Sequence, residues 1–353
     1  MLIAILAIFL ICVFLSFIEE RIIKRDLLIV FAMIGVAMIM IAGTRDVLDT
    51  PDSKNYESMF YSSGKMDISD DFREPTFMIM TSILNSMGLG INALFFAYAI
   101  LSIPIRLAAI WKMSKLPLLT LSIYISFYYQ LHDLVQIRCA VASALFVMAV
   151  YLHSKQQEKY AALCIIIGFF FHFSAIAGFA IFLFGNKPLK TWQAVTMGVV
   201  VLASVCIYFV GLDISQLIPD ELGGSRLQAY RELKEKGIEG DLEGVAFYKN
   251  PMVLTNLCLF YFCLFYHKYL TDLNHFLPLL LKIMMVGFIC CLTLGNLSSV
   301  VASRLFEYFD VVSIFLWTTV IYVFNPVYVG KLFTNVVSTA RILYSALIYT
   351  LQL

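Results

Sequence analysis

Runs of about twenty apolar residues recur from one end of this chain to the other. A helix of that length crosses the ~30 Å hydrocarbon core of a bilayer, where backbone polar groups must be satisfied within helices or closed barrels. Of the 353 residues, 61% are hydrophobic and only 14% are charged, well below the ~25% charged residues of soluble domains. The sequence therefore predicts an all-α, polytopic integral membrane protein.

The polar stretches are too short to form a separate soluble domain. The two longest, 44–74 and 212–250, are smaller than most independently folding domains. We therefore expect a single membrane domain, 1–353, with both stretches as loops on the outer face. All eight cysteines lie in apolar segments, so no disulfide framework is expected. Nothing in the sequence indicates a nucleic-acid partner.

About 10–12 transmembrane helices are expected, one or two of them broken or re-entrant. The clearest spans are 1–18, 27–43, 91–110, 117–130, 134–152, 192–211, 252–268, 276–296, 303–324 and 332–351. Segment 75–90 is short for a span and could be re-entrant or interfacial. Segment 160–184 has lysines on both sides, which the positive-inside rule places in the cytoplasm. That pattern favours a re-entrant hairpin with its elbow near His172, whereas one continuous span is the alternative.

The corner 131–138 joins two of these spans, with its tip predicted outside. It carries His132, Asp133, Gln136 and Arg138. A charge at bilayer depth costs ~2.5–3.5 kcal/mol on insertion scales, so it normally faces a bundle interior or a hydrated cavity. Arginine can hold a phosphate through two parallel donors. We interpret this corner as one wall of a site for an anionic, lipid-linked substrate.

Five arginines are predicted at outer ends of helices, where the positive-inside rule makes them unusual. They are Arg45, Arg73, Arg106, Arg138 and Arg304. Each could pair with a carboxylate nearby in sequence, such as Asp133, Glu307 or Asp310. Alternatively, several converge on one anion. Convergence from distant segments favours a pyrophosphate site.

Other candidate residues have two interpretations each. Asp46, Asp49 and Asp52 could coordinate a hard cation, but such a loop is more often simply solvated, so no metal site is predicted. Tyr56 could offer a flat face to a sugar ring or anchor the chain at the interface. His172 could accept a proton from an alcohol nucleophile, or it could be a hydrogen-bonded core residue.

An ordered set of short motifs resembles the EpsG-like branch of the Wzy-type polysaccharide polymerases. The motifs are G-T-R (43–45), D-S-K-N-Y (52–56), R-E-P-T-F (73–77), V-Q-I-R (135–138), A-x9-H-F-S-A (162–175) and S-R-L-F-E-Y-F (303–309). Two positions depart from the family pattern. Cys139 follows the helical arginine, where the family often has Gln, and Thr76 follows Glu-Pro, where it has Gly or Leu.

The resemblance implies a GT-C-like fold and a metal-independent, inverting glycosyltransferase without a cofactor. Such an enzyme would move a growing glycan from undecaprenyl pyrophosphate onto another lipid-linked repeat unit. It would sit in a bacterial inner (plasma) membrane with its active site facing the periplasm or exterior, with a chain-length regulator as a plausible partner.

We assign candidate residues on this basis. Arg45, Arg138 and Arg304 would hold the pyrophosphate, and His172 or Asp52 would be the general base. Tyr56, Arg73, Glu74 and Asp133, with Asp52, would shape the sugar site. The main alternative function is a flippase or transporter of a lipid-linked or anionic solute. A membrane O-acyltransferase would also use a buried histidine but gives no reason for the arginines.

Overall fold

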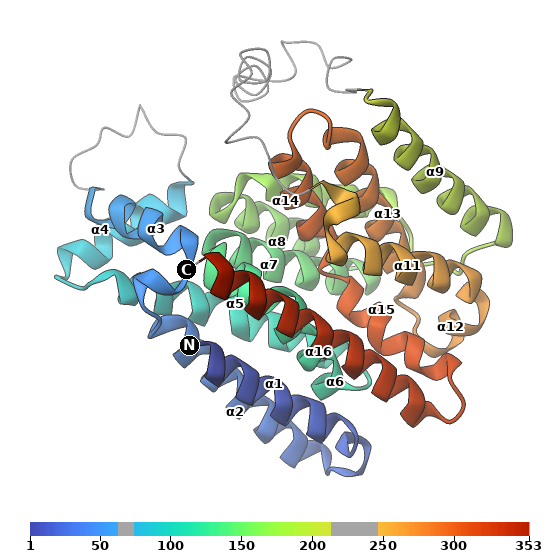
Figure 1. The fold of residues 1–353 in the computed structure, drawn as a ribbon, viewed down its shortest axis with the longest axis horizontal. Helices are drawn as coiled ribbons and strands as arrows, with labels where there is room; N and C mark the ends of the chain where they lie inside the picture. The colour runs from blue at the N-terminus through green and yellow to red at the C-terminus, as the bar shows by residue number, and fades with distance from the viewer. Residues whose placement is uncertain (63–73, 213–245, 353) are drawn as a thin grey trace. The chain divides into compact units, whose positions relative to one another are not determined.

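The computed structural model describes residues 1–62, 74–212 and 246–352 (Figure 1). Every element assigned within those ranges is helical, which confirms the all-α class. The chain divides into two compact units: Met1–Phe182 with Trp317–Leu353, and Leu183–Leu316. We call these the first and second units. The expectation of a single membrane domain stays a prediction. Of the two predicted outer loops, 44–74 is described except for 63–73, whereas 213–245 of the loop 212–250 lies outside the described residues.

The first unit contains nine α-helices among its described residues, joined by several tighter or wider turns. Its α-helices are α1 (Leu2–Ser16), α2 (Lys24–Gly43), α3 (Pro51–Ser62), α4 (Pro75–Ser86), α5 (Ile91–Met113), α6 (Pro117–Tyr124), α7 (Ile137–Ser154), α8 (Glu158–Phe171) and α16 (Val327–Gln352). Short or irregular helices are η1 (Glu19–Arg21), η2 (Val47–Asp49), η3 (Ile125–Val135), η4 (Phe173–Leu183) and η7 (Ile321–Val323). In Figure 1, α1 and α2 lie side by side, and α16 runs across α6.

The second unit is built around α13. Its described elements are α9 (Thr191–Val210), η6 (Phe247–Lys249), α11 (Pro251–Phe265), α12 (His267–Leu273), α13 (Leu277–Leu294) and α14 (Ser299–Asp310), and α15 (Ser313–Val320) leads back to the first unit. Helices α9, α11, α12 and α14 all contact α13. Gly287 of α13 permits a close approach, because a Cβ there would lie 3.1 Å from the Cβ of Phe309.

Five described helices are long and apolar enough to cross a membrane: α2, α5, α7, α9 and α13. The bent pair α14 and α15 makes a sixth, and α1, η4 and α11 are shorter apolar helices. The chain is thus a multi-pass membrane protein. Fewer helices meet this criterion than the ten to twelve expected, because several apolar segments are interrupted. The predicted span 252–268, for example, is divided between α11 and α12.

The predicted corner at 131–138 is formed by an irregular helix followed by a break in the chain. Helix α6 continues into η3, a π-helix of 11 residues, in which hydrogen bonds span one residue more than in an α-helix. The backbone N–H of Gln136 donates to Leu131 O at 2.8 Å, and the chain then breaks at Gln136, where φ is −97° and ψ is 61°. His132 and Asp133 therefore lie inside η3 and are buried. Arg138 is the second residue of α7.

The chain turns back at His172, as the predicted re-entrant hairpin requires, and the placement of that hairpin in a membrane stays a prediction. Helix α8 ends at Phe171, and His172 adopts an extended conformation with φ −156° and ψ 119°. The chain then returns through η4 to the end from which it came. The Phe182 ring lies 5.3 Å from that of His153, whose Nδ1 is 2.6 Å from the carboxylate of Glu158 at the start of α8.

Candidate functional site

Three segments far apart in the sequence meet at the carboxylate of Glu74. Arg138 donates a hydrogen bond from Nη1 to Glu74 Oε2, across 64 residues of sequence. On the other side, His172 Nδ1 lies 3.0 Å from Glu74 Oε1, across 98 residues. The two oxygens of one carboxylate therefore hold a guanidinium and an imidazole at the same time. We call Glu74, Arg138 and His172 the Glu74 triad.

Each member of the Glu74 triad lies at a helix end. Glu74 is the residue before α4, and Pro75 follows it as the first helical residue, a position where the missing N–H is not needed. Arg138 lies in the first turn of α7, directly after the break at Gln136. His172 follows the last residue of α8. Helix ends place side chains beside loops rather than on lipid-facing surfaces, so all three can face a polar site.

The members differ in exposure in a way that bears on function. The Glu74 side chain is 5% exposed, whereas those of Arg138 and His172 are 23% and 18% exposed. The carboxylate is thus covered, and the two groups that it holds reach the surface. A ligand could contact the guanidinium and the imidazole without displacing Glu74.

The charge of Glu74 is stabilised by its two partners. Burial by itself would raise the pKa of this carboxyl group. The hydrogen bond from His172 and the positive charge of Arg138 outweigh burial, and the pKa falls from 4.5 to about 2. Glu74 is therefore an ionised carboxylate at neutral pH, suited to keeping a proton on Nδ1 of His172 and leaving Nε2 to face other groups.

Aromatic rings form the walls beside Arg138. Its guanidinium carbon lies 5.5 Å from the ring centroid of Tyr56 and 5.4 Å from that of Phe77, within the range of cation–π attraction. The two rings are themselves 5.9 Å apart. Burial raises the pKa of Tyr56, while the charge of Arg138 acts in the opposite direction. Tyr56, predicted for the sugar site, is thus part of the surroundings of Arg138.

Arg45 lies at the other side of the same apolar core. Its guanidinium carbon is 3.6 Å from the ring centroid of Phe95, and Phe95 belongs to one core cluster with Tyr56 and Phe77. Nη1 of Arg45 donates to Ala42 O at 2.6 Å, and Nε donates to Ser53 Oγ at 3.4 Å. The side chain is buried, so its role in holding pyrophosphate stays a prediction.

The acidic residues after Arg45 have separate local roles. The Asp46 side chain accepts a hydrogen bond from Leu48 N, and that of Asp49 accepts one from Asp46 N, so the two cap η2. Asp52 lies on α3, one turn before Tyr56, and its negative charge acts to raise the pKa of that tyrosine. Asp52 is therefore close to the wall of the site, although it is not a member of the Glu74 triad.

Asp133 lies in a second polar group inside the first unit, and its predicted contact with a sugar stays a prediction. Its carboxylate accepts hydrogen bonds from Ser102 Oγ at 2.5 Å and from Tyr124 Oη. The side chain is 3% exposed. As it stands, both oxygens are bonded to interior hydroxyl groups, because η3 turns this face inward rather than toward the outer surface.

Arg106 belongs to this interior group and not to an outer helix end. It donates from Nη1 to Ser143 O at 3.1 Å and from Nη2 to Ser143 Oγ at 2.5 Å. Ser143 Oγ also lies 3.1 Å from His132 Nδ1. Arg106 is nearer the Met113 end of α5 than the Ile91 end, and it is 1% exposed. These sealed contacts contrast with the accessible Arg138 and His172.

The structure leaves the predicted roles of Arg304 and Arg73 untested. Arg304 is an exposed residue of α14 in the second unit, so its approach to Arg45 and Arg138 stays a prediction. Asp310, one of its suggested partners, accepts a hydrogen bond from Asn256 Nδ2. Arg73 lies outside the described residues. The suggestion that Arg138 pairs with a carboxylate is confirmed, but the partner is Glu74 and not Asp133.

The bridging position of Glu74 was not found by sequence reasoning, which assigned it only to a sugar site. Its partners are 64 and 98 residues away, so no local spacing relates them. The one available signal was the Glu-Pro pair, which marks the start of a helix. Sequence reasoning also did not predict that the guanidinium carbon of Arg341 lies 3.7 Å from the ring centroid of Phe127.

Comparison with known proteins identifies the family. The model of the EpsG family matches residues 28–352, nearly the whole chain. The chain belongs to the EpsG family. Neither a curated protein nor a solved structure matches it. Membership implies an exopolysaccharide-related role of the polymerase or glycosyltransferase type. The match extends across both units and includes every member of the Glu74 triad.

Proposed function

We propose that this EpsG-family protein is a polysaccharide polymerase. In this proposal it moves a growing glycan from undecaprenyl pyrophosphate onto the terminal sugar hydroxyl of another lipid-linked repeat unit. The observation that carries the proposal is the Glu74 triad, in which one buried carboxylate presents an arginine and a histidine to the surface. Those two groups match the two charges that develop during glycosyl transfer.

The reaction is a single displacement, which inverts the anomeric carbon. The acceptor hydroxyl oxygen forms a bond to that carbon as the bond to the diphosphate oxygen breaks. The diphosphate leaves with the bonding electrons, and the acceptor proton passes to a general base. Fixed guanidinium groups stabilise the negative charge on the leaving group, so no metal is required by this chemistry.

His172 is the preferred base of the two predicted candidates. Its Nδ1 lies 3.0 Å from Glu74 Oε1, which fixes the ring and favours the tautomer with a free Nε2. A carboxylate orients and supports a histidine base in the same way in hydrolase triads. Glu74 is then a positioning residue, because it acts on the substrate only through His172 and Arg138.

Arg138 is assigned to the leaving diphosphate. Glu74 takes a hydrogen bond from Nη1, and guanidinium has five donors in all, so others remain for phosphate oxygens. Tyr56 and Phe77 fix the plane of the group from the side. Arg45, Arg304 and Arg73 are further candidates for anion or sugar contacts. The active site in this proposal faces the outer side of the cell membrane.

The experiment that tests the proposal uses the purified full chain in proteoliposomes with synthetic lipid-linked repeat units. Longer lipid-linked glycans, formed without a nucleotide or added metal, are the expected product. His172→Ala should lower the rate by about 10²–10⁴, the usual range for general-base catalysis. Relocation of the lipid across the bilayer without chain growth would instead indicate a flippase and contradict the proposal.

His153→Ala is the matched control for His172→Ala. His153 also pairs through Nδ1 with a glutamate, Glu158, at 2.6 Å. His153 lies in the last turn of α7, and Glu158 begins α8, at the end of α8 opposite His172. The variant should keep near-normal polymerisation. Equal losses in both variants would mean that histidine removal harms the fold in general and would count against catalysis by His172.

A further inference from the structure

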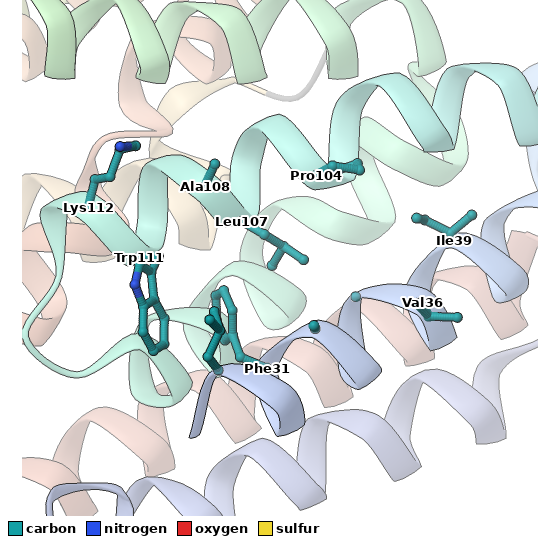
Figure 2. A pocket seen from close by; sticks show the side chains of 11 residues that line it. Phe31, Val36, Ile39, Pro104, Leu107, Ala108, Trp111 and Lys112 are labelled. Carbon is teal, nitrogen blue, oxygen red and sulfur yellow. The ribbon is translucent and has the colours of Figure 1, made fainter. Parts of the chain in front are cut away.

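A groove runs between α2 and α5 on the first unit, and the proposed function does not use it (Figure 2). Its volume is about 450 Å³, within the ~300–1,000 Å³ of ordinary small-molecule sites. Ten of its eleven lining residues are apolar, glycine included, and the only charged one is Lys112. It is therefore a site for an extended apolar ligand with a negative charge at one end.

The groove is formed by features of both helices. Leu107 projects from α5 toward α2 (Figure 2), where Gly35 has no side chain. A Cβ at Gly35 would collide with the Leu107 side chain, so glycine allows the two helices to approach there. Pro104 interrupts the hydrogen bonding of α5 at the other end of the groove. Ala32 and Ala108, on the Trp111 side of that contact, have small side chains that leave space in the groove.

The length of the groove points to one leaflet of the bilayer. On α2 its lining extends from Leu28 to Ile39, which is about 16 Å at 1.5 Å per residue. That is about half of the ~30 Å hydrocarbon core. An acyl chain of one leaflet has this reach, whereas a long polyprenyl chain would extend well beyond it.

The charged end of the groove identifies the leaflet and the ligand's head. Trp111 and Phe31 close this end, with ring centroids 5.6 Å apart. Lys112 follows Trp111 on α5; in Figure 2 its side chain points away from the two rings, and its Nζ lies 5.3 Å from the ring centroid of Tyr151. Lys115 follows on the chain, and Lys24 lies one turn before Leu28. The positive-inside rule places this end at the cytoplasmic surface, where tryptophan also favours the interface. The lysines there would attract an anionic headgroup.

We propose that this groove binds one acyl chain of an anionic glycerophospholipid from the cytoplasmic leaflet, with the phosphate beside Lys112. The bound lipid would stiffen the pair α2 and α5. The opposite ends of these helices carry Arg45 and its surroundings: Asn92 of α5 donates to Gly43 O and Arg45 O, both at 3.0 Å. Lipid binding at the inner surface would thereby support the arginine at the outer end.

The test uses the purified, delipidated full chain and three probes: phosphatidylglycerol, phosphatidylcholine and undecaprenyl phosphate. Native mass spectrometry counts bound lipid, and thermal unfolding reports stabilisation. We expect one retained phosphatidylglycerol and a larger rise in Tm with it than with phosphatidylcholine. Preferential retention of undecaprenyl phosphate would assign the groove to the substrate's tail and overturn the proposal, as would no retained lipid.

Two variants separate the apolar and charged parts of the site. Ala32→Trp fills the groove and should weaken lipid binding by about tenfold or more. Ala203→Trp makes the same change on the exposed face of α9 and should have no effect. Lys112→Gln should keep an acyl chain but weaken phosphatidylglycerol binding by about fivefold, the effect of ~1 kcal/mol per basic residue. Lys268→Gln, on α12, is its control.

Unchanged lipid retention in Ala32→Trp, with a normal unfolding profile, would overturn the proposal. Loss of folding in that variant leaves Lys112→Gln as the deciding measurement, because the exposed lysine is not needed for packing. Equal affinity of Lys112→Gln for the anionic and zwitterionic lipids supports the proposal. An undiminished preference for phosphatidylglycerol contradicts it. Polymerase activity enters neither readout, so this proposal can fail while the proposed function stands.

Discussion

At the scale of single residues, the carboxylate of Glu74 holds both side chains to which we assign catalysis, the guanidinium of Arg138 and the imidazole of His172. Arg138 is permanently charged and suits an anionic leaving group, whereas the imidazole of His172 can accept a proton and suits proton transfer. Removing one partner of such a buried ionic group leaves the other uncompensated. Informative variants therefore change the shape or the charge of one of these groups by a conservative substitution and leave the other groups in place.

Arg138→Lys keeps a positive charge that can still pair with Glu74. If Arg138 were only a structural partner, this variant should be close to normal. If it holds a diphosphate, most polymerase activity should be lost, by about 10²-fold or more, because an ammonium group cannot make the two-pronged contact. Product length and rate in proteoliposomes measure this, with the exposed Arg25→Lys as the control.

Glu74→Gln keeps a hydrogen-bond acceptor but removes the charge that holds the His172 ring. We expect kcat to fall about tenfold or more with KM little changed, because the imidazole is no longer held in the orientation and tautomer of a general base. Glu158→Gln breaks the corresponding pair with His153 and should leave kcat unchanged. An unchanged kcat in Glu74→Gln would mean that Glu74 does not act through His172.

The same carboxylate makes a prediction about acid stability. Its pKa is lowered from 4.5 to about 2 in the folded chain, so the unfolded chain binds more protons between those values. The stability that Glu74 contributes is present above pH 4.5 and is lost as the pH falls toward 2. The shift corresponds to about 3 kcal/mol. Unfolding measured between pH 6 and 3 should be less pH-dependent in Glu74→Gln than in the native chain; parallel curves would contradict this.

At the scale of elements, the sequence was a good guide to which segments turn back and a poor guide to how they turn. Lysines on both sides of 160–184 predicted the re-entrant hairpin, because charge distribution sets topology and is visible in sequence. The break predicted at 131–133, between the spans 117–130 and 134–152, lies a few residues later. The π-helix η3 moves the break to Gln136, and a change in hydrogen-bond period leaves no mark in hydrophobic spacing.

The close approach of α2 and α5 near Arg45 depends on Gly43. A Cβ at that position would collide with the ring of Phe96. Gly43→Ala should therefore displace the end of α2 and lower the thermal stability, with an overpacking cost of about 1–3 kcal/mol. Gly185→Ala is the control, because a Cβ there meets nothing within 4 Å. Equal unfolding temperatures for the two variants would show that Phe96 moves aside at little cost.

At the scale of the whole molecule, the sequence was sufficient for the class and the family and insufficient for the site. Membrane helices follow from composition, and the ordered motifs agree with the EpsG family match over residues 28–352. The union of Glu74, Arg138 and His172 depends on contacts between α4, α7 and α8, which no spacing encodes. Within the first unit, Glu74, Arg138 and His172 meet, whereas Asp133 belongs to an interior group; the part assigned to Arg304, in the second unit, stays a prediction.

The most direct test of the proposed chemistry is a cryo-EM structure of the full chain with an undecaprenyl-pyrophosphate-linked repeat unit bound. We expect the diphosphate beside the guanidinium of Arg138, with Arg45 and Arg304 as the further candidate contacts. His172 Nε2 should face the acceptor sugar while Nδ1 stays on Glu74. A diphosphate bound away from Arg138, with the Glu74 triad closed and untouched by substrate, would contradict the assignment.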